Sequence, residues 1–198
     1  MDKDILIWGA GAIGGTLGAY LVRAGYDVTF VDIMQEHVAA IGDPARGLQI
    51  SGPLDTFTIH APAFTPQTLT GTWRRILLAV KAQDTLAAAQ ALDKHLAADG
   101  FVASFQNGLC EPYIASVVGA ERTVGAFVNF GADWIGPGEV LFANRAAVVV
   151  GELDGRRSAR VTQLHADLLH FEPDAIITDD IASFLWGKLA YGALLHAQ

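Results

Sequence analysis

The sequence predicts an α/β fold with a doubly wound, mostly parallel sheet. Short apolar runs typical of buried strands alternate with segments of helical spacing along nearly all of the 198 residues. The first two such strands are joined by a helical segment, and this unit has the size of a βαβ crossover, about 30 residues. Hydrophobic residues make up 52% and charged residues 17% of the chain, a composition that is too apolar for a disordered protein.

The first strand–helix–strand unit is the clearest. Residues 4–8 form an apolar run, which indicates a strand buried on both faces. Residues 12–24 repeat apolar positions at helical spacing, and Gly25 ends that helix. Residues 27–31 are rich in β-branched and aromatic side chains, which predicts the second strand.

The alternation then continues to the end of the chain. A pair of short strands is expected within 47–60 and a loop over 61–72. Asp84 or Thr85 is placed to cap an alanine-rich helix, and Pro112 suits a first helical position. The remaining predicted helices cover 34–41, 84–98, 112–118, 157–170 and about 180 to the end, and the remaining strands cover 75–80, 101–105, 123–130, 138–142, 146–151 and 174–178. Repeated β–α alternation predicts a parallel sheet with helices on both faces.

Charge and composition exclude several classes of function. The formal net charge of −8 disfavours binding to nucleic acid or to an anionic membrane. No apolar stretch reaches the roughly 18 residues that a membrane span needs, and the N-terminus lacks a signal-peptide pattern. Cys110 is the one cysteine, and His165 and His170 lie five apart, the wrong spacing for a metal site on one helix face. We therefore expect a cytoplasmic protein without a metal, nucleic-acid or membrane partner.

The most informative motif is a glycine-rich turn between the first strand and the first helix. In this context the GxGxxG pattern is the dinucleotide-binding fingerprint. Its first glycine allows a tight turn, its second lets the backbone approach a pyrophosphate, and its third lets helix and strand pack closely. A tight turn without a ligand is the alternative. The predicted cofactor-binding residues here are Gly9, Ala10, Gly11, Ala12, Ile13 and Gly14.

Asp32 ends the second strand, eighteen residues after Gly14. A carboxylate at this position can accept hydrogen bonds from the adenosine ribose of NAD, and its charge repels the 2′-phosphate of NADP. No Arg or Lys lies between Asp32 and Arg46. The alternative is a helix cap or a solvated strand end. We predict a preference for NADH.

Three further residues are candidates because of where they lie. Lys81 and Asn107 each follow a predicted strand, and ligands of open parallel sheets bind beyond the carboxyl ends of the strands. Lys188 lies on an otherwise apolar side of the last helix. The alternatives are a solvated lysine, a simple Asn-Gly turn and a lysine that extends to solvent along the helix.

Taken together and in this order, these segments resemble the ketopantoate reductase family. The resemblance rests on the glycine fingerprint, on Val80-Lys81-Ala82, on Gln106-Asn107-Gly108 and on Trp186-Gly187-Lys188. It implies a Rossmann-type fold and NAD(P)H-dependent reduction of a 2-oxo acid, 2-dehydropantoate to pantoate. It also implies that Lys188 is the general acid and that Lys81 and Asn107 hold cofactor and substrate.

The chain departs from the family pattern at three points. Gly192 stands where the family usually has a substrate-contacting asparagine. Family members commonly use NADPH, whereas Asp32 favours NADH. The family also has an all-helical C-terminal domain, so we expect residues 1–178 to be the NAD(P)-binding domain and 179–198 to begin the inter-domain helix. A dehydrogenase of another 2-oxo or 2-hydroxy acid, or a non-catalytic cofactor-binding module, are the alternatives, and the apolar last helix favours a homodimer.

Overall fold

The computed structural model describes residues 4–196, with side chains up to Ala193. Its main sheet has eight strands in the order β12-β11-β8-β7-β6-β1-β2-β5. All neighbouring pairs are parallel except β11 with β8, so the predicted doubly wound, mostly parallel sheet is confirmed. The strands are β1 (Asp4–Trp8), β2 (Asp27–Val31), β5 (Ala63–Phe64), β6 (Trp73–Leu78), β7 (Leu96–Ser104), β8 (Thr123–Val128), β11 (Val148–Glu152) and β12 (Ile176–Ile177).

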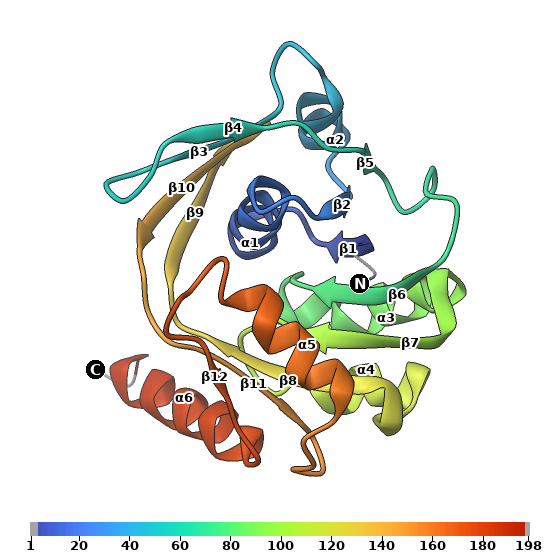
Figure 1. Cartoon of the computed structure of the whole chain (residues 1–198), viewed down its shortest axis with the longest axis vertical. Coiled ribbons are helices and arrows are strands. Elements are labelled where there is room, and N and C mark those ends of the chain that lie inside the picture. Colours follow the sequence, from blue (N-terminus) through green and yellow to red (C-terminus); the bar gives the residue numbers. More distant parts are fainter. Residues whose placement is uncertain (1–3, 197–198) are drawn as a thin grey trace.

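Helices cover both faces of this sheet (Figure 1). Along β1, Ile5 and Ile7 point into one core, while Leu6 and Trp8 point into another on the opposite face. The first core takes up side chains of α1 and α5, and the second takes up those of α3 and α4. The helices are α1 (Ala12–Arg23), α2 (Gln35–Gly42), α3 (Thr85–Leu92), α4 (Glu111–Val118), α5 (Ala159–Leu168) and α6 (Ile181–His196).

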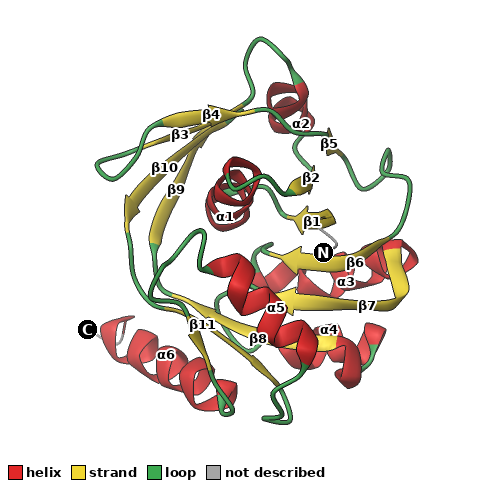
Figure 2. Cartoon of the chain, viewed as in Figure 1, coloured by secondary structure: helices red, strands yellow, loops and turns green. Residues whose placement is uncertain are grey.

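A second sheet of four strands, in the order β4-β3-β10-β9, curves around α1 (Figure 2). Its strands are β3 (Leu48–Ser51), β4 (Phe57–Ile59), β9 (Gly131–Gly136) and β10 (Glu139–Asn144). Helix α1 therefore lies between two sheets, which explains its small residues. A Cβ on Gly18 would lie 2.4 Å from the Phe30 ring, and one on Gly15 would lie 3.2 Å from Val140.

The predicted strand pair within 47–60 is confirmed as β3 and β4, but β9 was not predicted. Most residues of β9 are exposed or half-buried, and glycines stand at both of its ends. It therefore shows no apolar alternation of the kind that identifies a half-buried strand. An edge strand that pairs only with β10 needs no such pattern.

Three local predictions were wrong. The helix expected over 84–98 ends at Leu92, and β7 already begins at Leu96, because pairing with β6 overrides the helix propensity of the alanines there. The loop expected over 61–72 contains β5, which pairs with β2. The Asp84 side chain does not cap α3, and the Thr85 hydroxyl instead donates to the Ala82 carbonyl.

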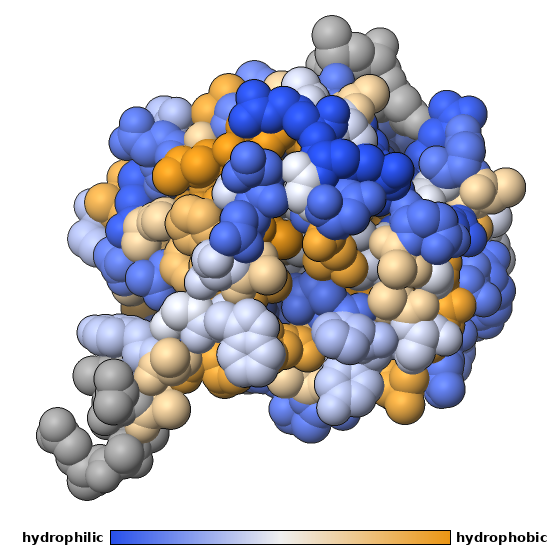
Figure 3. Space-filling view, turned by 90° about the horizontal axis from the view of Figure 1, so that it is seen from below, coloured by the Kyte–Doolittle hydropathy of each residue, from blue (hydrophilic) through white to orange (hydrophobic). Residues whose placement is uncertain are grey.

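Helix α6 packs across β8 and β11 through Ile181 and Leu185, which are buried, whereas Trp186 and Tyr191 remain more than 60% exposed. The first turns of α6 therefore fold back on the main sheet. Apolar and hydrophilic residues are interspersed on this end of the molecule (Figure 3). Within residues 4–196, no helix is long and apolar enough to cross a membrane.

Candidate functional site

The predicted site residues lie along one edge of the main sheet. Strands β1, β2, β6, β7 and β8 run parallel, so their carboxyl ends share this edge. Gly9 follows β1, Asp32 follows β2, and Lys81 and Asn107 lie shortly after β6 and β7. The strand order reverses at β1, which has β2 on one side and β6 on the other. Such a switch point is where open α/β sheets bind ligands.

Two glycines of the fingerprint are required by the protein itself. Gly9 has φ 101°, and a Cβ there would lie 2.8 Å from the backbone of Ala79 and Val80. A Cβ on Gly14 would lie 2.0 Å from the Gly9 carbonyl oxygen. These glycines therefore make the turn and let α1 start directly against β1, as the fingerprint predicts.

Gly11 is different, because the fold does not require a glycine there. Its φ of −67° suits any residue, and a Cβ would meet nothing within 4 Å. Open space beside Gly11 and the N-terminus of α1 is suited to a phosphate group, which backbone N–H groups and the helix dipole can bind. The loop therefore fits the pyrophosphate of a dinucleotide.

Substituting alanine at these two positions is expected to separate stability from binding. Gly14→Ala forces backbone against backbone and should lower the free energy of unfolding by about 1–3 kcal/mol. Gly11→Ala should unfold like the wild type yet bind NADH more than about tenfold more weakly, because its methyl group occupies the phosphate's space. Thermal unfolding and NADH fluorescence titration measure the two effects. Unchanged NADH affinity in Gly11→Ala would contradict this reading of the loop.

The Asp32 carboxylate, which is half-buried, organises the loop around the candidate site. Its Oδ2 accepts a hydrogen bond from the Ala10 N–H at 2.9 Å, and its Oδ1 accepts one from the Met34 N–H at 3.0 Å. Each carboxylate oxygen keeps a second lone pair. Asp32 therefore closes the turn before α2 without being its N-cap, which is Met34, and it retains acceptor capacity for a ribose.

Lys188 and Asn107 meet although they lie 81 residues apart. The Lys188 Nζ donates to the Asn107 Oδ1 at 2.5 Å and to the Val128 carbonyl, and it lies 5.3 Å from the centre of the Phe127 ring. Burial lowers the pKa of the Lys188 ammonium. The side chain thus points at the ends of β7 and β8 and not along the helix to solvent.

Lys81 is exposed and lies at the start of the short 3₁₀ helix η1 (Ala82–Asp84). A residue that sequence reasoning left without a role, Gln106, links its segment to the turn that carries Asn107. The buried Gln106 amide donates to the Val80 carbonyl at 2.9 Å and to the Thr85 hydroxyl at 2.8 Å. Its place directly after a buried strand was the available signal.

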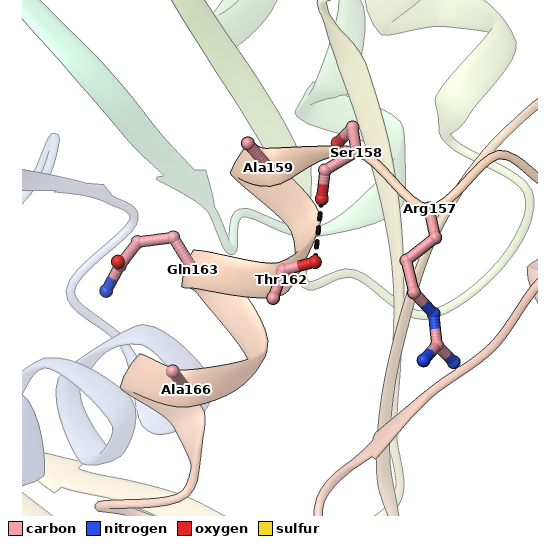
Figure 4. A pocket seen from close by; sticks show the side chains of 6 residues that line it. All are labelled: Arg157, Ser158, Ala159, Thr162, Gln163 and Ala166. Carbon is pink, nitrogen blue, oxygen red and sulfur yellow. Dashed lines mark hydrogen bonds between the residues drawn. The ribbon is translucent and has the colours of Figure 1, made fainter.

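One surface pocket lies elsewhere, along the first turns of α5 (Figure 4). There the Thr162 hydroxyl donates to the Ser158 carbonyl at 2.8 Å. The pocket contains none of the predicted site residues. Its lining residues are Arg157, Ser158, Ala159, Thr162, Gln163 and Ala166.

Known proteins resemble this chain in sequence and in structure. The sequence profile of ketopantoate reductase PanE/ApbA matches residues 5–155. The 2-dehydropantoate 2-reductase of Archaeoglobus fulgidus is 30% identical over 98% of this chain and 62% of its own length. A solved 2-dehydropantoate 2-reductase from Geobacter metallireducens superposes with a TM-score of 0.84 at 28% identity, over 96% of this chain and 62% of that one.

A second kind of enzyme is equally similar in structure. D-mandelate dehydrogenase, solved with NADH and anilino(oxo)acetate, gives a TM-score of 0.85 at 25% identity, over 93% of this chain and 60% of that one. This chain spans about 62% of the length of the curated relatives that it matches. Because the family profile covers most of the chain, and because fold and motifs agree with it, the chain belongs to the ketopantoate reductase family.

Proposed function

We propose that this chain is the cofactor-binding part of an NAD(P)H-dependent reductase of a 2-oxo acid, with 2-dehydropantoate as substrate and pantoate as product. The observation that carries the proposal is the contact between Lys188 and Asn107. It lies on the same edge of the main sheet as the glycine loop. A partly desolvated cation on the same edge of the sheet as the glycine loop supports proton transfer next to a bound dinucleotide. Family membership supports the same reaction class.

The geometry suits Lys188 to act as a general acid. A lysine ammonium has three N–H donors, and two of them are engaged by Asn107 and Val128. The third is available for the carbonyl oxygen of a 2-oxo acid. When bound, the reduced nicotinamide supplies the hydride. Negative charge then develops on that oxygen, and a preplaced cation that also releases a proton stabilises it.

The other residues of the proposed site bind and orient. The Asn107 side chain fixes the Lys188 ammonium through its oxygen and keeps its amide N–H groups for cofactor or substrate. Lys81, exposed at the same edge, supplies a cation for a carboxylate or a phosphate. Gly9 to Gly14 hold the pyrophosphate, and Asp32 holds the adenosine ribose. We further propose that 1–178 form the cofactor domain and that 179–198 begin an inter-domain helix.

A dehydrogenase of another 2-oxo or 2-hydroxy acid is the second candidate. Gly192 offers no side chain where the family usually has a substrate-contacting asparagine. The structural similarity to D-mandelate dehydrogenase also favours a substrate other than 2-dehydropantoate. Such an enzyme would use the same lysine and the same cofactor loop.

The deciding experiment is the oxidation of NADH and NADPH, followed by absorbance, with 2-dehydropantoate and with a panel of other 2-oxo acids. Oxidation that depends on 2-dehydropantoate supports the first candidate, and oxidation with another acid supports the second. NADH binding without turnover on any acid would indicate a cofactor-binding module. A chain that binds neither dinucleotide would refute the proposal.

Asp32 is expected to make NADH the preferred cofactor. A carboxylate at the end of β2 repels the 2′-phosphate of NADPH, so we expect NADH to bind more than about tenfold more tightly. Asp32→Asn keeps an oxygen acceptor and removes the charge, and it should reduce this preference mainly by improving NADPH binding. Fluorescence titration of both variants with both cofactors measures the four Kd values. Comparable wild-type Kd values for NADH and NADPH would contradict the assignment.

A further inference from the structure

His37, in α2, joins three segments that are far apart in the sequence. Its side chain is 1% exposed. Its Nε2 lies 2.8 Å from the Ala10 carbonyl oxygen in the glycine-rich loop. Its Nδ1 lies 2.9 Å from the Gly138 backbone nitrogen and 3.3 Å from the Trp134 indole nitrogen, both in the β9–β10 hairpin.

These contacts decide which nitrogen of His37 carries the proton. A backbone N–H and an indole N–H can only donate. The Nδ1 atom of His37 must therefore accept from Gly138 and Trp134, and it is unprotonated. The neutral ring then carries its proton on Nε2, which donates to the Ala10 carbonyl.

The hairpin holds the imidazole in place from the other side. The Gly138 carbonyl accepts a hydrogen bond from the Gln49 N–H at 2.8 Å, and the Arg46 guanidinium donates to the Pro137 carbonyl at 2.8 Å. A Cβ on Gly138 would lie 2.9 Å from the Ala40 side chain, so the turn packs directly against α2. The second sheet therefore fixes the position of His37.

We propose that His37 is a positioning residue that aims the Gly11 N–H at the pyrophosphate of the dinucleotide. The Ala10 N–H is held by Asp32 and the Ala10 carbonyl by His37, so both peptide units flanking Ala10 have fixed orientations. In a planar trans peptide the C=O and the following N–H point in opposite directions. Holding the Ala10 carbonyl toward His37 thus turns the Gly11 N–H away from His37. This inference rests on the proposed dinucleotide binding.

Two substitutions separate the contact of the His37 Nε2 atom from the contacts of its Nδ1 atom. In His37→Gln the side-chain amide can reach the place of Nε2 and still donate to Ala10, while the bonds from Gly138 and Trp134 are lost. In His37→Asn the side-chain oxygen can replace Nδ1 as acceptor from Gly138, while the bond to Ala10 is lost. His37→Gln loses the two contacts at Nδ1, whereas His37→Asn loses the single contact at Nε2, so a stability effect alone should be at least as large in His37→Gln.

We expect His37→Gln to bind NADH nearly as tightly as the wild type and His37→Asn to bind it up to about tenfold more weakly, the effect of one oriented hydrogen bond. The Tm values of both variants, measured without ligand, should fall, and that of His37→Gln should fall at least as far as that of His37→Asn. Amide hydrogen exchange over residues 9–14, measured without NADH, should be faster in His37→Asn than in His37→Gln.

A purely structural role predicts that NADH affinity follows Tm, so that His37→Gln binds NADH no more tightly than His37→Asn. That result would overturn the inference and leave the proposed function intact. A wild-type chain that binds no NADH would overturn both. Equal exchange over residues 9–14 in the two variants would overturn the positioning role independently of any ligand.

Discussion

Replacing Lys188 with alanine is expected to lower kcat for 2-oxo acid reduction by about 10²–10⁴-fold, the usual contribution of a general acid. The affinity for NADH should remain nearly unchanged, because the glycine loop and Asp32 follow β1 and β2, whereas Lys188 contacts the ends of β7 and β8. The loss of kcat is expected because the Lys188 ammonium is fixed between Asn107 and Val128 at the sheet edge. Steady-state kinetics together with NADH titration separate the two quantities.

The pH profile tests the same role. Burial lowers the pKa of Lys188 below that of an exposed lysine, so the ammonium loses its proton at a lower pH. Only the protonated form can donate, so kcat should fall as the pH rises through the lowered pKa. Lys188→Arg keeps the charge at every accessible pH and should lack this fall. Full activity of Lys188→Ala, or a loss of NADH affinity as large as the loss of rate, would contradict the assignment.

That the candidate site residues share one edge of the main sheet could be predicted from the sequence, because parallel strands place their carboxyl ends on one edge. The alternating strand and helix patterns were enough to predict that Gly9, Asp32 and Asn107 lie on this edge. The contact of Lys188 with Asn107 could not be predicted. It depends on how α6 docks, and Ile181 packs there against Gly125 and Gly151, where a Cβ would lie about 3 Å from its side chain.

The second sheet marks the limit of reasoning from local patterns. Strand β9 has no apolar alternation, and β3 pairs in parallel with β10, about ninety residues later, through a contact that no local pattern records. The Nδ1 atom of His37 acquires its partners only when this sheet forms, since Gly138 and Trp134 belong to its hairpin. The pairing of segments that are distant in the sequence thus determines the second sheet, which local propensity does not predict.

A buried ion pair between Arg75 and Asp167 connects β6 with α5. The Asp167 Oδ2 lies 2.6 Å from the Arg75 guanidinium, and the two side chains are 1% and 7% exposed, respectively. The Oδ1 atom of Asp167 accepts from the Tyr26 hydroxyl at 2.8 Å and from the Gln163 amide at 2.7 Å. Burial, together with the hydrogen bond to Asp167, raises the pKa of Tyr26 to about 12. The carboxylate is therefore the centre of this buried polar cluster.

Asp167→Asn is expected to lower the free energy of unfolding by about 3–5 kcal/mol, because it removes the buried negative charge that Arg75 contacts. For a chain of this size each kcal/mol lowers Tm by about 2–4 °C, so calorimetry should show a decrease of about 6–20 °C. Asp99→Asn is the matched control, since Asp99 pairs with Arg74 and both side chains are at least 59% exposed. Removing a charge from such an exposed pair should cost less than about 1 kcal/mol. Equal Tm shifts for the two variants would show that burial of the Arg75–Asp167 pair does not determine its contribution to stability.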